Sequence, residues 1–267
     1  MVLERRIGNN GVVYYASANF DAVGVRHAFS TRIGGTSPAP FDSLNLGNPG
    51  CDVRDDYDRI WANYSRLTSS IGCGEEPPLR VHQVHGREVA CVEAGRVFDT
   101  GERADALVSR DSQRVISVRT ADCVPVLLCS GDGRIVAAVH AGWRGIIAGV
   151  IPAAAGKMLE GAGAAGTILA AIGPCIGPEA FEVGPEVLQA FIDVFGEAAP
   201  IARKADGKGT VDLRLAARMQ LLSSGLRECN VDSTDRCTLT HRDEFFSHRR
   251  ERGITGRMAA VIAANRS

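Results

Sequence analysis

Short runs of apolar and β-branched residues occur along the chain, and each run is closed by glycine, aspartate or other turn residues. Runs of this length and composition are typical of β-strands. We therefore predict strands over residues 12–15, 89–92, 115–118, 124–130, 133–140, 167–172 and 257–263.

Four other segments repeat their apolar residues at helical spacing, and they predict helices over residues 57–68, 145–160, 185–195 and 211–225. Pro152 lies inside the second segment, and we expect it to kink that helix or to mark its true start. Strands and helices do not alternate strictly along the chain. This order predicts an α+β fold with mixed β-sheets and helices packed outside them.

The most apolar stretch, residues 124–140, predicts a β-hairpin with Gly131 and Asp132 as a two-residue type II′ turn. This register places Cys123 directly opposite His140, in a non-hydrogen-bonded pair where side chains approach most closely. Pro125 fits this register because its missing N–H would cost the ladder nothing. The pair alone is compatible with a metal site, with a nucleophilic Cys–His dyad, or with an inert buried thiol beside a core histidine.

A third metal ligand is available in the segment VHQVHG, residues 81–86. His82 and His85 differ in strand parity, so only one of them is expected to point inward. We expect this to be His85, which precedes a glycine, and we expect His82 at the surface or behind the ligands. One cysteine and two histidines with an open fourth position would resemble a catalytic zinc site.

Asp122 has the opposite strand parity to Cys123, so we expect it to point away from such a site unless a local bulge brings it in as an acid or base. Arginines beside glycines are candidates for binding an anion, because guanidinium groups and turn N–H groups both attract oxyanions. These arginines are Arg32 in FSTRIGG, Arg144 in AGWRG, and Arg249 and Arg250 in FFSHRRERG. Each is also compatible with a surface residue in a tight turn.

Composition excludes some classes of function. The chain has 267 residues, of which 45% are hydrophobic, and its 30 basic and 31 acidic residues give a net charge of −1. This balance argues against a nucleic-acid partner. The start of the chain does not resemble a signal peptide, and no apolar stretch is long enough to cross a membrane, so we expect a cytoplasmic protein without a membrane partner. The eight cysteines lack CxxC pairs and are expected to be reduced.

Several motifs, taken together and in order, resemble those of the YfiH-like family: FSTRIGGTSPAPFDSLNLG, QVHG, TADCVPVLL, AAVHAGWRG, IGPCIG, FEVGPEV and RCTLTHRDEFFSHRR. The resemblance covers about residues 27–263, and we predict one domain over residues 1–267. This family was labelled multicopper polyphenol oxidase, or laccase domain, and is now described as purine nucleoside phosphorylases. The resemblance implies an α+β fold related to the catalytic domain of cytotoxic necrotizing factor, and a zinc ion bound by His85, Cys123 and His140.

The resemblance also implies a reaction: phosphorolysis of adenosine, inosine and 5′-methylthioadenosine to the free base and a ribose 1-phosphate, with some deamination of adenosine. The partners would then be a nucleoside and phosphate, and the chain a monomer or homodimer. Arg32 and Arg144 are the predicted phosphate-binding residues, and Phe181 or Phe246 is a candidate for stacking on the purine.

Three alternatives remain open at this point. Copper can replace zinc at a Cys/His site, which would fit the older oxidase label of the family. A Cys–His amidohydrolase, acting in peptidoglycan quality control, would use Cys123 as nucleophile and His140 as base. A non-catalytic binding module is the third alternative.

Overall fold

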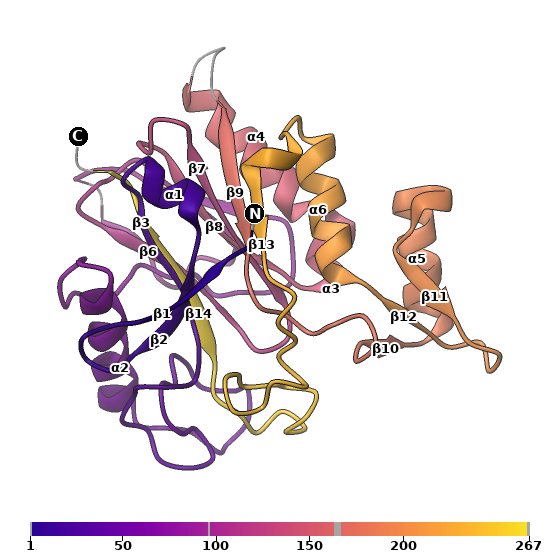
Figure 1. The fold of residues 1–267 in the computed structure, drawn as a ribbon, viewed down its shortest axis with the longest axis horizontal. Helices are drawn as coiled ribbons and strands as arrows, with labels where there is room; N and C mark the ends of the chain where they lie inside the picture. Colours follow the sequence, from indigo (N-terminus) through magenta and orange to yellow (C-terminus); the bar gives the residue numbers. More distant parts are fainter. Residues whose placement is uncertain (1, 96, 163–166, 266–267) are drawn as a thin grey trace.

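The computed structural model describes residues 2–95, 97–162 and 167–265. Two large β-sheets form its centre (Figure 1). The five-stranded sheet is antiparallel throughout and has the order β1 (Glu4–Ile7), β2 (Val13–Ala16), β3 (Arg26–Ser30), β14 (Met258–Ala263), β6 (Val115–Thr120). The six-stranded sheet is parallel only at its two outermost pairs and has the order β13 (Val231–Ser233), β9 (Ile168–Ile172), β7 (Val124–Ser130), β8 (Val136–Ala141), β5 (Ala106–Ser109), β4 (Val89–Val92).

Helices cover the outer faces of both large sheets. Helix α2 (Tyr57–Ser70) packs on the five-stranded sheet, and α3 (Trp143–Ala148), α4 (Val150–Ala162) and α6 (Leu213–Ser223) pack on the six-stranded sheet. A short helix α1 (Ala18–Ala22) precedes β3, and single 3₁₀ turns occupy Gly196–Ala198 and Glu228–Asn230. Mixed sheets with helices outside confirm the predicted fold class. None of the described helices is long and apolar enough to span a membrane.

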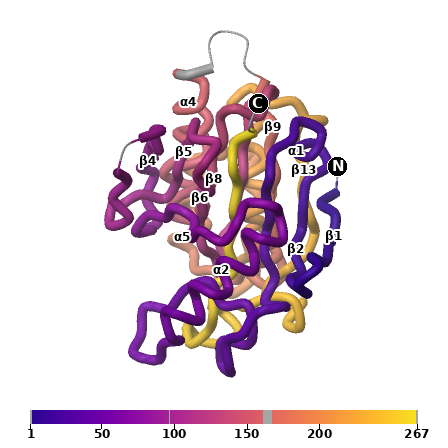
Figure 2. The backbone as a smooth tube through the Cα atoms, turned by 90° about the vertical axis from the view of Figure 1, so that its left-hand side faces the viewer, coloured from indigo at the N-terminus to yellow at the C-terminus, as the bar shows by residue number. Residues whose placement is uncertain are grey.

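A smaller third sheet lies at the side of the molecule, to the right in Figure 1, together with α5 (Pro185–Phe195). Its strands have the order β10 (Glu182–Val183), β12 (Gly209–Val211), β11 (Ile201–Arg203). Figure 2 shows the two large sheets from the side, with β4 and β1 at opposite margins of the molecule.

The central hairpin β7–β8 is buried on both faces. Leu127 and Ala138 pack into the core between the two large sheets, whereas Val126 and Val139 pack into the core beneath the helices. A strand buried on both faces needs apolar residues at every position, and this explains why β7 and β8 are nearly uninterrupted apolar runs. Functional groups are therefore confined to the ends of these strands.

Most predicted elements occur close to their predicted bounds, and β4, β7 and α5 match them. The predicted helix over 145–160 is instead two helices, because Gly149 has a φ of 82° and ends α3. Pro152 lies in the first turn of α4, where a proline leaves no helical hydrogen bond unmade. The unpredicted elements are short strands and one short helix: β1, β3, β5, β10, β11, β12, β13 and α1.

The predicted register of the hairpin is wrong by two residues. His140 lies opposite Pro125, and Cys123 precedes β7. The loop is longer than a two-residue turn because the Asp132 carboxylate accepts hydrogen bonds from Ser130 Oγ (2.5 Å) and Arg134 N (3.1 Å), and Gly133 takes the left-handed conformation with a φ of 72°. A shift by an even number of residues leaves every side chain on its predicted face.

Candidate functional site

His85, Cys123 and His140 converge at one end of the central strands β7 and β8. One ligand atom from each residue lies within 4.8 Å of the others, and Cys123 Sγ is 3.9 Å from His85 Nε2. The two imidazole rings meet edge to face, with centroids 4.8 Å apart. We refer to these three residues as the metal trio. The structure thus brings together the three predicted ligands, although the hairpin register that first connected two of them is wrong.

The backbone is unusual at one residue of the metal trio and directly before another. His85 has a φ of 61°, and Asp122, just before Cys123, has a φ of 93°. Non-glycine residues adopt this left-handed region rarely, so surrounding contacts must hold them there. For the His85 loop, the holding group is the Asp105 carboxylate, which accepts hydrogen bonds from the N–H groups of Val84, His85 and Gly86 at 3.1, 2.9 and 2.6 Å.

The same carboxylate orients His140. The ring Nδ1 of His140 donates to Asp105 Oδ1 at 2.8 Å, which leaves Nε2 for a metal or for the thiol. Burial disfavours a charged carboxylate at this position, but hydrogen bonds from His140 and Gly86 outweigh it and lower the pKa of Asp105. Asp105 was not among the site residues predicted from the sequence. The available signal was a lone acidic residue at the start of a buried apolar strand, which requires a partner.

A missing side chain makes room for the metal trio. Gly142 follows β8 directly, and a Cβ atom there would lie 2.8 Å from His85 Cδ2 and 3.1 Å from Cys123 Sγ. The first of these distances is shorter than van der Waals contact allows. Glycine at this position therefore permits the ligands to approach one another.

The charges of Cys123 and His140 support each other. Burial disfavours the Cys123 thiolate, but the His140 imidazolium outweighs this effect and lowers the pKa of the thiol to about 6. Burial likewise disfavours the charged ring of His140, but the Cys123 thiolate and Asp105 raise its pKa to about 9. A thiolate with two adjacent imidazoles has the chemistry of a metal-binding site or of a nucleophile.

The metal trio opens into a cavity of about 600 Å³. Its other lining residues come from five segments of the chain: Asn48, Pro49, Gly50, His82, Gln83, Arg119, Thr120, Ala121, Asp122, Ile176, Phe181, His248, Arg249 and Arg257. The wall carries three arginines and an aromatic ring, so the cavity can accommodate a ligand with an anionic part and a flat apolar part. Neither Arg119 nor Arg257 was predicted from the sequence, because Arg257 was assigned to the predicted strand 257–263 and Arg119 directly follows the predicted strand 115–118.

The structure does not bring Arg32 or Arg144 to this cavity. The Arg32 guanidinium stacks on Phe246, bonds the carbonyl oxygen of Asp42 at 2.7 Å and forms an ion pair with the Asp42 carboxylate. Arg144 is exposed, and its guanidinium lies 4.2 Å from the centroid of its neighbour Trp143. The cavity thus offers arginines other than the two that were predicted to bind phosphate.

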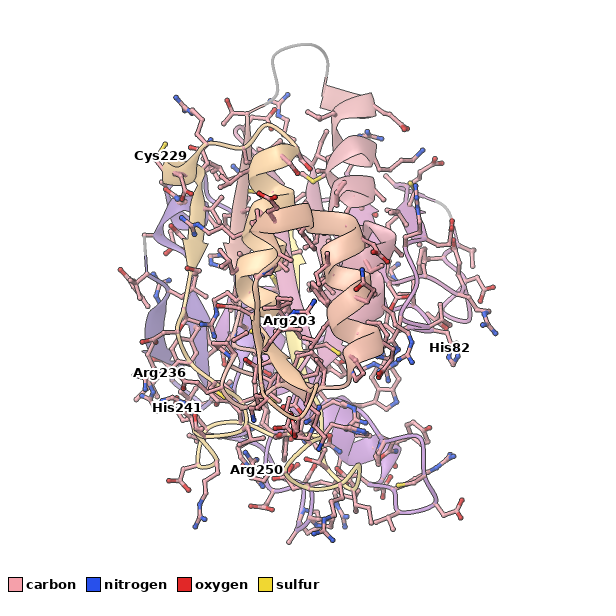
Figure 3. The ribbon with its side chains drawn as sticks, turned by 90° about the vertical axis from the view of Figure 1, so that its right-hand side faces the viewer. His82, Arg203, Cys229, Arg236, His241 and Arg250 are labelled. Carbon is pink, nitrogen blue, oxygen red and sulfur yellow. The ribbon has the colours of Figure 1, made fainter. Side chains whose placement is uncertain are left out.

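Arg249 lines the cavity, whereas the guanidinium of Arg250, labelled in Figure 3, donates hydrogen bonds to the carbonyl oxygens of Thr238, Leu239 and Phe245. Of the two arginines in the segment FFSHRRERG, Arg249 therefore lies in the cavity wall and Arg250 has a structural role.

Three further candidates can now be placed. His82 is exposed at the margin of the molecule in Figure 3 and lines the cavity without belonging to the metal trio. Phe181 lines the cavity, with the Arg249 guanidinium 5.4 Å from its ring centroid. Phe246 is fully buried in the core, so Phe181 is the candidate that a purine can reach.

Asp122 has a structural role. Its carboxylate accepts hydrogen bonds from Thr238 Oγ1 at 2.6 Å, from Ser247 Oγ at 3.1 Å and from the backbone N–H of Arg249 at 2.7 Å. These bonds attach the loop that carries His248 and Arg249 to the strand end that carries Cys123.

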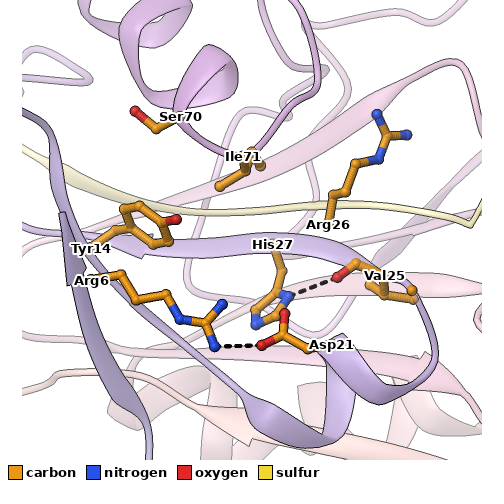
Figure 4. A pocket seen from close by; sticks show the side chains of 9 residues that line it. Arg6, Tyr14, Asp21, Val25, Arg26, His27, Ser70 and Ile71 are labelled. Carbon is orange, nitrogen blue, oxygen red and sulfur yellow. Dashed lines mark hydrogen bonds and ion pairs between the residues drawn. The ribbon is translucent and has the colours of Figure 1, made fainter. Parts of the chain in front are cut away.

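A second cavity, of about 350 Å³, lies beside β3 (Figure 4). Its histidine and its Arg6–Asp21 pair are already occupied, because Arg6 pairs with Asp21 and both ring nitrogens of His27 have hydrogen-bond partners. His27 Nδ1 donates to the carbonyl oxygen of Val25 at 2.9 Å, and Nε2 accepts from the N–H of Ser17 at 2.7 Å. This cavity lacks a free reactive group among its described residues.

Comparison with known proteins places this geometry in context. The family model described as multi-copper polyphenol oxidoreductase laccase matches residues 26–265. Purine nucleoside phosphorylase YfiH of Escherichia coli strain K12 is 41% identical over 239 residues, which cover 90% of this chain and 93% of that protein. Purine nucleoside phosphorylase PA4543 of Pseudomonas aeruginosa is 39% identical over 241 residues, which cover 89% and 93%.

Two crystal structures of similar proteins have the same fold. The crystal structure of YlmD from Geobacillus stearothermophilus has a TM-score of 0.85 and 29% sequence identity, and the match covers 98% of each chain. The crystal structure of the Bacillus licheniformis hypothetical protein YfiH has a TM-score of 0.86 and 26% identity, covering 98% of this chain and 99% of that one.

Proposed function

Because this chain belongs to the YfiH-like, laccase-labelled family, we propose that it is a zinc-dependent purine nucleoside phosphorylase, the name that several of its relatives carry. Its substrates would be adenosine, inosine or 5′-methylthioadenosine together with phosphate. The observation that carries the proposal is the metal trio at one wall of a cavity that also contains arginines and an aromatic ring.

The metal trio fits a zinc ion by its chemistry. One sulfur and two imidazole nitrogens are common zinc ligands, and three protein ligands leave a fourth position open. The carboxylate of Asp105 behind His140 is the kind of outer partner that zinc-binding histidines have. When bound, zinc would supply a Lewis acid and lower the pKa of a coordinated water, which is the chemistry that deamination of adenosine requires.

The residues of the cavity match the needs of phosphorolysis. In this reaction a phosphate oxygen forms a bond to C1′ of the ribose while the bond from C1′ to the purine nitrogen breaks, and the purine leaves with the bonding electrons and takes up a proton. Phe181 can stack on the base, and the arginines stabilise phosphate and the negative charge that develops. The Asp105–His140 hydrogen bond holds the imidazole in a single orientation during the reaction.

The test is to supply the purified protein with each nucleoside, with and without phosphate, and to identify the products. We expect free base and ribose 1-phosphate only when phosphate is present. Metal analysis of protein prepared without added metal should find zinc, and a chelator should abolish turnover until zinc is restored. Cys123→Ser and His85→Ala should each abolish turnover while leaving the unfolding temperature close to that of the wild type.

Cys229→Ser provides the matched control, because Cys229 is exposed and lies far from the cavity (Figure 3). It should retain full activity. Undiminished turnover in both Cys123→Ser and His85→Ala would contradict the proposal. Zinc-free protein that oxidises phenols only with added copper would support the older oxidase label instead.

A second candidate is a Cys–His amidohydrolase, and the lowered pKa of the Cys123 thiol favours it. In that reaction the thiolate would attack an amide carbonyl, and His140 would protonate the leaving nitrogen. An amidase activity that iodoacetamide abolishes and a chelator does not affect would establish this candidate. It would also displace the metal-dependent proposal.

A further inference from the structure

Arg119 and Arg257 lie side by side in the cavity wall. Arg119 is on β6, and Arg257 directly precedes β14, which pairs with β6 so that Ala259 lies opposite Arg119. Because residues 257 and 259 share strand parity, the two arginine side chains project from the same face of the strand pair. Both side chains lie beside Gly47. A Cβ atom added to Gly47 would lie 2.8 Å from Arg119 Cδ and 3.5 Å from Arg257 Cγ.

Within the part of the chain that the structure describes, no carboxylate forms an ion pair with either arginine. The Arg119 guanidinium forms no hydrogen bond or ion pair with any residue that the structure describes. Among the described residues, the Arg257 guanidinium donates only to the carbonyl oxygens of Thr255 and Gly256, at 2.9 and 3.0 Å. Burial and the neighbouring Arg119 charge lower the pKa of Arg257, which shows that the two positive charges repel each other.

Asp122, the acidic residue in the lining of the cavity, already has hydrogen-bond partners. The three hydrogen bonds that Asp122 accepts come from Thr238, Ser247 and Arg249, so its carboxylate is committed to the C-terminal loop. The third arginine of the cavity wall, Arg249, already donates to the carbonyl oxygen of Glu182 at 3.0 Å and lies over the Phe181 ring. Two half-buried guanidinium groups without an anion are unfavourable, and a bound oxyanion would relieve the repulsion.

We propose that Arg119 and Arg257 form the binding site for inorganic phosphate, the second substrate, beside the metal trio. Naming phosphate rests on the proposed function, whereas the oxyanion site rests on the geometry of the two arginines. Guanidinium groups bind phosphate oxygens through paired N–H donors, so two of them fix both the position and the orientation of the ion. Binding there presents one phosphate oxygen to C1′ of a nucleoside in the same cavity.

The atoms of the step balance without any further reactant. A hydrogen phosphate dianion forms a bond from oxygen to C1′, and the bond from C1′ to the purine nitrogen breaks. The purine leaves with that electron pair and takes the proton of the phosphate, which yields neutral purine and the ribose 1-phosphate dianion. The two arginines keep the charge of the phosphate compensated throughout.

The test measures binding of inorganic phosphate to the purified, metal-containing protein by calorimetry, together with the KM values for phosphate and for inosine. Arg119→Gln and Arg257→Gln should each raise the Kd and KM for phosphate by about tenfold or more, because each removes hydrogen bonds to a charged group. The KM for inosine should stay within about twofold of the wild-type value because the nucleoside site is intact. Arg257→Lys should retain part of the affinity.

Arg134→Gln is the matched control, because Arg134 is exposed at the hairpin turn, outside the cavity. Arg119→Gln breaks no guanidinium contact with the described residues, so it should fold normally even if Arg257→Gln does not. Unchanged phosphate binding in Arg119→Gln and Arg257→Lys would overturn the inference, whether or not the protein is a phosphorylase.

The two proposals can fail separately. Phosphate binding that depends on both arginines, in a protein without phosphorolysis, would confirm the oxyanion site and contradict the proposed function. Adenosine 5′-monophosphate is a second probe. If the substitutions weaken the binding of adenosine 5′-monophosphate and leave the binding of inorganic phosphate unchanged, the two arginines bind the phosphate group of a nucleotide. The proposal is then wrong.

Discussion

The Asp105 carboxylate determines the geometry of the metal trio at the scale of single residues. It receives three backbone N–H groups from the His85 loop and the ring Nδ1 of His140, so one buried group positions two ligands. A buried carboxylate is costly unless it is fully hydrogen-bonded, and here it is. The left-handed backbone of His85 is therefore maintained by the side chain of the residue that directly precedes β5.

In metal-free protein, the thiol of Cys123 should have unusual reactivity. The Cys123 pKa of about 6 predicts that Cys123 of the metal-free protein reacts with iodoacetamide with a midpoint near pH 6, whereas an ordinary thiol titrates near 8.5. Peptide mass spectrometry can follow Cys123 separately from the other cysteines. His140→Ala should move the midpoint upward, and a wild-type midpoint above pH 8 would contradict the prediction.

The pKa shifts of Cys123 and His140 predict how the stability of the metal-free protein depends on pH. The Cys123 pKa is lowered on folding, so the stabilisation by the thiolate is lost as the pH falls through about 6. The His140 pKa is raised on folding, so the stabilisation by the imidazolium is lost as the pH rises through about 9. Their combined contribution is therefore largest between these two values, and thermal unfolding across this range measures it.

At the scale of elements, the junction between β8 and α3 sets how closely the ligands approach. Gly142→Ala should lower the affinity for zinc, because the new methyl group would collide with His85 and Cys123. Competition with a chelator measures this affinity.

Gly156→Ala is the matched control within α4, since its Cβ would meet no atom within 4 Å. We expect the control to raise the free energy of unfolding by about 0.5–1 kcal/mol and to leave zinc binding unchanged. Equal zinc affinity in both variants would contradict this role of Gly142.

At the scale of the whole molecule, Asp122 joins the end of β6 to a loop more than a hundred residues away in the sequence. Asp122→Ala should lower the free energy of unfolding by about 2–4 kcal/mol, because it leaves two hydroxyls and one N–H without their charged acceptor. Hydrogen exchange at residues 247–250 should accelerate, since this loop would lose its attachment.

Asp122→Asn serves as the comparison, because its amide oxygen can still accept part of these hydrogen bonds. It should lie between the wild type and Asp122→Ala in both stability and exchange. Unchanged exchange at residues 247–250 in the alanine variant would show that other contacts hold the loop.

The sequence alone determined the elements that carry a local signal. Apolar runs predicted the bounds of β4 and β7, and helical spacing after Gly184 predicted the bounds of α5. These signals depend only on neighbouring residues. The convergence of the metal trio was also predicted from sequence, since a register error of two residues leaves Cys123 and His140 on the same face. Short strands such as β3 and β5 escaped prediction, because pairing with β14 and β8 stabilises them and local composition does not.

Only the tertiary structure decided which other residues reach the site. Arg119 and Arg257 are neighbours because β14 returns to pair with β6, and Asp105 is buried behind His140 because β5 pairs with β8. Arg32 is bound to Asp42 instead, although its glycine-rich segment predicted an anion site. Contacts between residues distant in the chain depend on strand order, and strand order is set by the packing of the two sheets and their helices as a whole.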